Sequence, residues 1–161
     1  MPAHNRLRSF EALDSCHRQI HVHLDELGAL VDQVARDNLD YAARKCAKNI
    51  EIFFSTAARG HHAEEEEHVF PCLLIGDDHA TVAKVRELIE DHFWIEKYWL
   101  NLAPLLRAIG SGANDTDAAH FAQAVKLFHD LSSYHIESEE SMIYPQAKAT
   151  LCGTYPRPVL G

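Results

Sequence analysis

The sequence predicts an all-α protein that folds as an antiparallel up-down-up-down four-helix bundle. Along four long segments, apolar residues recur at spacings of three and four, which is the periodicity of an amphipathic helix. No segment alternates apolar and polar residues cleanly, as a half-buried strand would. Short clusters of turn-forming residues separate the four segments, and short connections make neighbouring helices run in opposite directions.

The first predicted helix runs from about Ser9 to Arg36. It ends at the polar cluster Asp37–Asp40, which can also supply the N-cap of the next helix. The second helix is expected to continue to Phe70 and to end there, because Pro71 lacks the N–H group that a helix interior needs.

The third predicted helix spans about Asp78 to Ile109, and Pro104 is expected to kink or loosen its last turn. The run Gly110–Asp115 is the clearest turn in the sequence. The fourth helix is expected to follow it, from about Thr116 to Ala149.

Composition favours one domain and excludes several partners. A chain of 161 residues with 47% hydrophobic residues can bury its own core, so we expect one domain with a core of about residues 9–150 and a tail over residues 151–161. The net charge of −9 leaves no basic stripe for nucleic acid. No stretch approaches the roughly 18 to 20 apolar residues of a membrane span, and Met1–Arg6 leads into no signal-like apolar run. We therefore expect a cytoplasmic protein without a membrane partner, and the sequence is compatible with a homodimer.

Histidine is the residue type that stands out. It accounts for 12 of the 161 residues, and several histidines fall inside the apolar-periodic segments rather than in loops. The four cysteines form no C-x-x-C pair, which argues against a zinc knuckle or a disulfide framework and favours buried thiols. They are Cys16, Cys46, Cys72 and Cys152.

Two predicted helices share one apolar stripe that begins with a histidine, at spacings of 3, 4, 3, 4 and 3. In the first helix the stripe is His17, Ile20, Leu24, Leu27, Val31 and Val34. In the third it is His92, Ile95, Trp99, Leu102, Leu106 and Ile109. Each leading histidine therefore lies in line with the core.

The second and fourth predicted helices also repeat each other. Each carries a histidine, His61 or His135, with a glutamate four residues later and a proline ten residues later. The glutamates are Glu65 and Glu139. His61 lies 44 residues after His17, and His135 lies 43 residues after His92. The sequence therefore indicates an internal duplication of a helical hairpin.

Residues four apart lie on one face of a helix, so each histidine and its glutamate can reach the same ion from adjacent turns. Together with His17 and His92 of the first and third helices, these two pairs place four imidazoles and two carboxylates in the interior of the bundle. A single tetrahedral ion cannot use six such ligands, whereas two ions bridged by Glu65 and Glu139 can. Nitrogen and oxygen donors suit iron, manganese or zinc, and open coordination positions favour iron doing oxygen chemistry.

Taken singly, each of these residues has an ordinary structural explanation. A lone histidine in a helix seam, such as His17, is more often a hydrogen-bonded core residue than a ligand, and the run Glu64–Glu67 alone is typical of a solvated face. The repetition argues against this explanation. The bundle would have to bury both His-x-x-x-Glu pairs together, at a cost of several kcal/mol if they were unpaired.

These motifs resemble those of the hemerythrin-like, or HHE cation-binding, domain family. The resemblance extends over about residues 10–150. Four motifs in register carry it: His17-x-x-Ile20, His61-His62-x-x-Glu65-Glu66-x-x-Val69-Phe70-Pro71, Glu90-Asp91-His92-x-x-Ile95 and His135-x-x-x-Glu139-Glu140-x-x-Ile143-Tyr144-Pro145. It implies a hemerythrin-like bundle with a non-heme di-iron centre, that is, two iron ions rather than manganese or zinc, with an oxo or hydroxo bridge. The implied terminal ligands are His17, His61, His92 and His135, and the implied bridges are Glu65 and Glu139.

The sequence departs from the oxygen-carrying hemerythrins at two positions. Their third helix carries His-x-x-x-His, whereas His92 is followed here by Glu96. Their fourth helix ends in a His-x-x-x-x-Asp pair, whereas this chain has His135-x-x-x-Glu139. These departures argue against a simple carrier role.

Three further residues are candidate metal ligands. Glu96 and its repeat counterpart His21 would either ligate an iron or hydrogen-bond a ligating imidazole. His62 follows His61 at 100° of rotation around the helix, which favours a place behind the ligands or at the rim of the site.

The six candidate ligands and the aromatic residues around them indicate a protein that binds or responds to dioxygen, nitric oxide or peroxide at an open iron position. Aromatic side chains can shape a dry pocket for such a ligand, and the candidates are Phe54, Trp94, Trp99, Phe128 and Tyr144. Two alternatives stay open. One is a di-iron oxidoreductase that consumes peroxide or acts as an oxidase, and the other is a sensor of metal level whose bundle unfolds on metal loss.

Overall fold

The computed structural model describes the backbone of residues 3–153 and the side chains of residues 9–150. Within this range the chain contains no strand and forms four helical rods. The first rod is α1 (Ala3–Ala35) and the third is α5 (His79–Gly110). The second comprises α2 (Tyr41–Ser55), α3 (Ala57–Glu64), the π-helical turn η1 (Glu65–Val69) and α4 (Phe70–Leu74). The fourth comprises α6 (Ala118–Ser138), the π-helical turn η2 (Glu139–Ile143) and α7 (Tyr144–Gly153).

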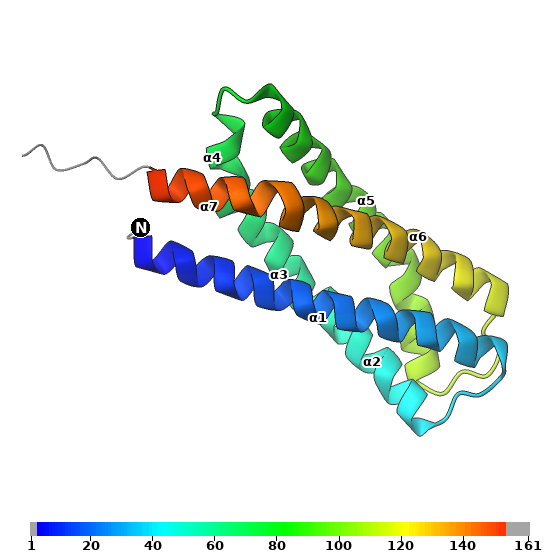
Figure 1. Cartoon of the computed structure of the whole chain (residues 1–161). Helices are drawn as coiled ribbons and strands as arrows, with labels where there is room; N and C mark the ends of the chain where they lie inside the picture. The colour runs from blue at the N-terminus through cyan, green and yellow to red at the C-terminus, as the bar shows by residue number, and fades with distance from the viewer. Residues whose placement is uncertain (1–2, 154–161) are drawn as a thin grey trace, which may run out of the picture.

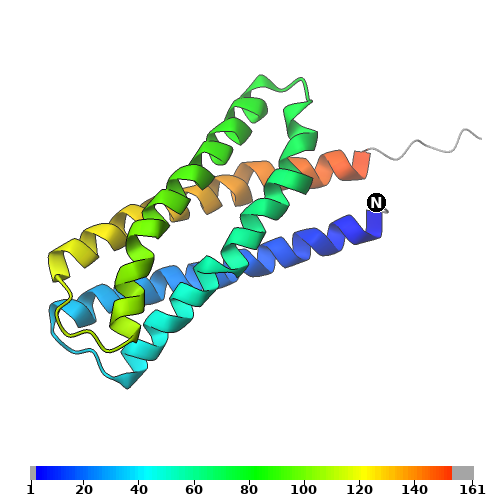
Figure 2. The ribbon, with the colours of Figure 1, turned by 180° about the vertical axis from the view of Figure 1, so that it is seen from behind.

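The four rods form an antiparallel bundle (Figure 1). Helix α1 packs beside α6, α2 packs beside α5, and α5 also contacts α6. The start of α1, the connection from α4 to α5 and the end of α7 lie at one end of the bundle, and the other two connections lie at the opposite end (Figures 1 and 2). The all-α fold predicted from the helical periodicity is confirmed. Among the described residues, no helix combines the length and apolar character that crossing a lipid bilayer requires.

Aspartate side chains begin three of the rods. Asp40 accepts a hydrogen bond from the backbone N–H of Ala43 at 2.8 Å, which confirms the capping role predicted for the cluster Asp37–Asp40. Asp78 and Asp117 accept backbone N–H groups in the same way at the starts of α5 and α6. These caps satisfy N–H groups that the first turn of a helix leaves without partners.

The second rod differs from the single helix predicted to end at Phe70. It is interrupted at Thr56, whose backbone leaves the helical region at φ −125° and ψ −80°, and it continues past Pro71 to Leu74. Pro71 is tolerated because it lies in the first turn of α4, directly after the π turn, where its missing N–H group is not needed. The prediction that Pro71 ends this helix was therefore wrong.

The fourth rod repeats this arrangement. Residue Pro145 follows the π turn η2, and α7 continues beyond it to Gly153 rather than ending at Ala149. In each π turn, a backbone N–H bonds to the carbonyl five residues earlier, from Phe70 to Glu65 and from Tyr144 to Glu139. Both π turns thus begin at a glutamate that the sequence assigns to metal, and such turns are frequent at functional sites.

Two other predictions concern the ends of the long helices. Residue Pro104 lies inside α5, and the residues after it remain α-helical up to Gly110, so the last turn is not lost there. The predicted tail begins later than residue 151, since α7 includes Gly153. The remaining tail, residues 154–161, lies outside the described residues.

The core consists of two apolar clusters, one toward each end of the bundle. The larger includes Leu27, Ile50, Leu102, Leu106 and Phe121, all fully buried. The smaller is built around Phe70, Val85, Leu88, Ile143 and Ala147. Between them, on all four rods, lies a layer of buried histidine and glutamate side chains. The two apolar clusters therefore seal this polar layer from both ends.

A matched pair of substitutions on α5 tests the core. Leu102 is fully buried, whereas Leu100, two residues earlier, is 59% exposed. Truncation of Leu102 to alanine leaves a cavity, so we expect Leu102→Ala to lower the free energy of unfolding by about 2 to 5 kcal/mol. Leu100→Ala should change it by less than about 0.5 kcal/mol. Urea unfolding in the presence of a chelator measures both, and equal effects of the two substitutions would contradict this assignment of the core.

Candidate metal centre

The structure brings together all six residues that the repeat predicts as metal ligands. They come from every rod: His17 on α1, His61 and Glu65 on α3 and η1, His92 on α5, and His135 and Glu139 on α6 and η2. All six are buried, and the two glutamates are completely inaccessible to solvent. The four histidines are at most 7% exposed. The sequence places them there because each occupies the inward position of its helical stripe.

The four imidazoles form two pairs whose Nε2 atoms face each other. His17 Nε2 lies 3.0 Å from His61 Nε2, and His92 Nε2 lies 3.1 Å from His135 Nε2. Each pair joins the two helices of one copy of the duplicated hairpin. Two neutral imidazoles that aim the same ring atom at one point offer converging lone pairs, which is the arrangement that a shared cation requires.

Each carboxylate extends from one histidine pair to the other. Glu65 places Oε1 2.9 Å from His61 Nε2 and Oε2 3.2 Å from His92 Nε2. Glu139 places Oε1 2.9 Å from His135 Nε2 and Oε2 3.1 Å from His17 Nε2. Both glutamates therefore present one oxygen to each half of the cluster.

These carboxylates are poorly satisfied by the protein alone. Glu65 Oε2 and both oxygens of Glu139 are buried and have no hydrogen-bond partner of good geometry among the described residues. The short distances to imidazole nitrogens bring charges together but leave the oxygen lone pairs unused. Buried carboxylate oxygens without partners are unfavourable, and a cation satisfies them without a donor hydrogen. The residues present thus fit a bound metal.

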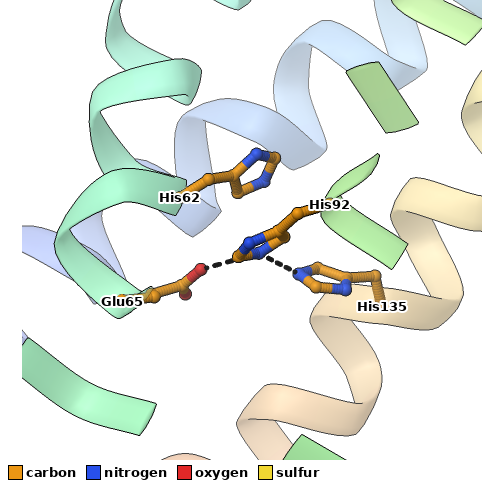
Figure 3. Close-up of side chains that lie close together, drawn as sticks. All are labelled: His62, Glu65, His92 and His135. Carbon is orange, nitrogen blue, oxygen red and sulfur yellow. Dashed lines mark hydrogen bonds and ion pairs between the residues drawn. The ribbon is translucent and has the colours of Figure 1, made fainter. Parts of the chain in front are cut away.

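His62 lies against the cluster and not at its rim, the second of the two positions predicted for it. Its ring stacks on His92 at a centroid distance of 4.1 Å. Figure 3 shows His62, Glu65, His92 and His135 converging from three rods, and their ligand atoms lie within 4.8 Å of one another. A second such group comprises His17, His61, Glu65 and Glu139. His62 is therefore a candidate third nitrogen ligand for one half of the cluster.

The other two candidates are not brought to the cluster. Glu96 forms an ion pair with the guanidinium of Arg59, and both side chains are more than two-fifths exposed. His21 is half exposed and lies 3.7 Å from Glu140 at the surface. In the structure these side chains face other partners, and whether either ligates a metal stays a prediction.

Three of the four imidazoles have a carboxylate at the ring nitrogen that points away from the cluster. His17 Nδ1 lies 3.2 Å from Glu140, His92 Nδ1 lies 2.7 Å from Glu66, and His135 Nδ1 lies 3.3 Å from Asp91. A carboxylate that accepts the Nδ1 proton holds the ring and leaves the Nε2 lone pair free for a metal. Sequence reasoning did not assign these roles. The signal was present, since Glu66 and Glu140 each follow a predicted bridging glutamate directly.

Tyr144 is a further polar group that sequence reasoning considered only as an aromatic wall. Its hydroxyl donates a hydrogen bond to Glu65 Oε1 and lies 3.2 Å from His17 Nε2. Burial and the nearby carboxylates Glu65 and Glu139 raise the pKa of Tyr144 far above its usual value. The counterpart of Tyr144 in the first half is Phe70, so only one half of the cluster has this proton donor.

Without a metal, the cluster holds protons. Burial lowers the pKa of His17, but its contacts with Glu139 and Glu65 outweigh burial and raise that pKa to about 9. The pKa values of His61 and His135 are raised against burial in the same way, to about 10 and about 9. Burial raises the pKa of Glu65, but its contacts with His17, His61 and His92 lower it by more and hold that pKa well below 4.5. At neutral pH the ion-free cluster therefore contains imidazolium groups next to carboxylates.

A small apolar cavity lies on the His62 side of the cluster. Its volume is about 20 Å³, and its lining includes Phe54, Ala58, His62, Ile95, Trp99 and Phe128. The exposed ion pair between Arg59 and Glu96 also lines it. Three of the aromatic residues predicted to shape a dry pocket are thus present, whereas Trp94 is 41% exposed on the outer face of α5. A cavity of this size holds one molecule as small as water.

The pKa shifts predict how the ion-free protein responds to pH. The histidine pKa values rise on folding from about 6.5 to between about 9 and about 10, so their contribution to stability is complete below pH 6.5 and is lost as the pH rises through 9 to 10. We expect the free energy of unfolding, measured with urea and a chelator, to fall by more than ~1 kcal/mol from pH 7 to pH 10. The decline should be smaller in Glu139→Gln and unchanged in the exposed-site control His68→Gln. A stability that stays constant or increases over this range would contradict the charge arrangement.

The sequence also matches a known protein family. The model of the hemerythrin HHE cation-binding domain matches residues 8–147, which include all six predicted ligands and both π turns. No curated protein matches the chain. The match covers most of the chain, and the family predicted from the four motifs is confirmed. The chain belongs to the hemerythrin HHE cation-binding domain family.

Proposed function

We propose that this protein holds two iron ions in the histidine and glutamate cluster and binds or responds to dioxygen, nitric oxide or peroxide at an open iron position. One observation carries the proposal. Glu65 and Glu139 each direct one oxygen to the pair His17 and His61 and the other oxygen toward the pair His92 and His135.

This arrangement favours two ions over one. The ligand atoms fall into two groups that share Glu65, and each group contains at least two imidazole nitrogens. One ion placed between all four imidazoles would leave most carboxylate oxygens without a partner. Two ions would use both oxygens of each glutamate, and the two carboxylate charges would offset part of the charge of two divalent cations.

The donor set and the cavity favour iron and a small ligand. Imidazole and carboxylate donors without thiolate are typical of non-heme iron sites. When bound, iron supplies reversible binding or reduction of oxygen, nitric oxide or peroxide. The cavity of about 20 Å³ beside His62 is lined mainly by apolar side chains, which favours a small uncharged ligand at this side of the cluster. The apolar clusters on both sides of the polar layer exclude bulk water from it.

The remaining polar groups orient the ligands and hold protons. Glu140, Glu66 and Asp91 fix the rings of His17, His92 and His135 through their Nδ1 atoms. Tyr144 keeps its hydroxyl proton because its pKa is raised, and it directs that proton to Glu65 Oε1. The half that contains His17 and His61 therefore has a proton donor, and the half that contains His92 and His135 has the additional imidazole of His62.

A peroxide-consuming oxidoreductase at the same centre is the second candidate function. The buried hydroxyl of Tyr144 favours it, because reduction of peroxide to water, with electrons from a reduced metal or from a second peroxide molecule, needs protons at the reacting oxygens. Binding alone would need no such donor. Peroxide consumption that falls at least about tenfold in Tyr144→Phe, with metal content unchanged, would support the enzyme. Absence of peroxide consumption in the wild type would leave binding as the function.

The metal content tests the two-ion proposal. Protein grown with ample iron should contain two iron ions per chain, measured by anomalous scattering and by elemental analysis. Glu139→Gln should reduce this to one or fewer, because a neutral amide cannot bridge two cations. Glu137→Gln, an exposed change two residues earlier on α6, is the matched control and should retain two. A wild-type protein with one ion or none would overturn the proposal.

Stopped-flow spectroscopy tests the ligand. The reduced iron protein should show an optical change on mixing with at least one of dioxygen, nitric oxide and hydrogen peroxide. Ala58→Val adds two methyl groups at the wall of the small cavity beside His62, so it should slow that change without altering the metal content. The control is Leu100→Val on the exposed face of α5. No change with any of the three ligands would end the gas-binding or peroxide-binding proposal.

A further inference from the structure

One of the four imidazoles lacks the carboxylate that the other three have. His17, His92 and His135 each have a carboxylate oxygen within 3.3 Å of Nδ1. The Nδ1 atom of His61 is buried and has no hydrogen-bond partner of good geometry among the described residues. His61 itself is only 5% exposed. A buried N–H group at this position is unfavourable unless a neighbouring group accepts its hydrogen bond.

The internal duplication indicates which group this should be. His135, the counterpart of His61, pairs with Asp91, the residue directly before His92 on α5. The corresponding residue in the first half directly precedes His17 on α1, and it is Cys16. The repeat therefore places a thiol beside His61 where the second half places a carboxylate beside His135.

The structure agrees with this placement. The Cys16 thiol lies near the His61 ring and is among the groups that raise the pKa of His61 to about 10. Cys16 and His61 also line the same surface pocket of about 470 Å³, together with Ser9, Gln19 and Glu64. The Ser9 hydroxyl donates to Glu64 at 2.8 Å on the rim of this pocket. Cys16 is half buried, so the pocket connects it with solvent.

We propose that Cys16 is a positioning residue of the metal centre: its sulfur accepts the Nδ1 proton of His61 and thereby orients this imidazole toward the ion held by His17 and His61. This inference rests on the proposed two-ion centre. A thiol is a weaker acceptor than a carboxylate, so His61 is held less firmly than its counterpart His135. Because the pocket reaches Cys16, a reagent from solvent that modifies this thiol can alter the orientation of His61.

Cobalt titration of three variants tests the inference. Co²⁺ is titrated into ion-free protein against a chromophoric chelator, which yields a dissociation constant for each of two ions, and the visible spectrum reports the geometry of each. Cys16→Ala should raise the dissociation constant of one ion by roughly 10-fold to 100-fold, because it removes a group that orients a ligand. The dissociation constant of the other ion should not change. Cys16→Asp reproduces the Asp91 arrangement, so the dissociation constant of that ion should return to within about threefold of the wild-type value. Its visible spectrum should also match that of the wild type. Cys46→Ala, a half-buried cysteine on α2, is the control and should behave as wild type.

The outcomes separate this inference from the proposed function. Two ions bound with wild-type affinity in Cys16→Ala, or equal weakening in Cys16→Ala and Cys16→Asp, would overturn the role of Cys16 and leave the two-ion centre intact. A wild type that binds one Co²⁺ or none would overturn both. Circular dichroism checks the fold of each variant. If Cys16→Ala does not fold, Cys16→Ser replaces it, and a loss smaller than about tenfold but confined to one ion is the expected result.

Discussion

The burial of two carboxylates among four imidazoles is the constraint on which the rest of the structure depends. Glu65 and Glu139 are completely buried, and three of their four oxygens have no hydrogen-bond partner of good geometry among the described residues. Protons on the imidazoles relieve part of this charge when no ion is present, and a cation relieves more of it. The apolar clusters on both sides, the carboxylates behind three of the imidazoles and the Tyr144 hydroxyl all act on this one layer.

Much of the fold and the six central residues could be predicted from the sequence. Helical periodicity predicted the rods, short connections predicted their antiparallel order, and the spacing of His61 to Glu65 and of His135 to Glu139 placed each pair on one helix face. The continuation of both rods past Pro71 and Pro145 could not be predicted, because a proline normally ends a helix. The π turns that make room for these prolines depend on packing around the glutamates, which local sequence does not reveal.

The details around the ligands were harder to predict for a different reason. The imidazole of His62 can face the cluster or the rim, depending on a modest rotation of its side chain. Glu96 has a competing partner, Arg59, that comes from another rod. Such choices depend on contacts between rods. The duplication was a better guide than spacing within one helix, since it relates Glu66 to Glu140 and Cys16 to Asp91 before any distance is known.

The way in which the two hairpins share the cluster bears on how the chain arose. Each hairpin carries two imidazoles and one carboxylate of the six, and each carboxylate reaches across to the other hairpin. A single hairpin could therefore complete the same set only by pairing with a second copy of itself about a twofold axis, as homodimers commonly do. Fusion of two such copies would free each half to change alone, and the differences between Tyr144 and Phe70 and between Cys16 and Asp91 are changes that an obligate symmetric dimer could not have made.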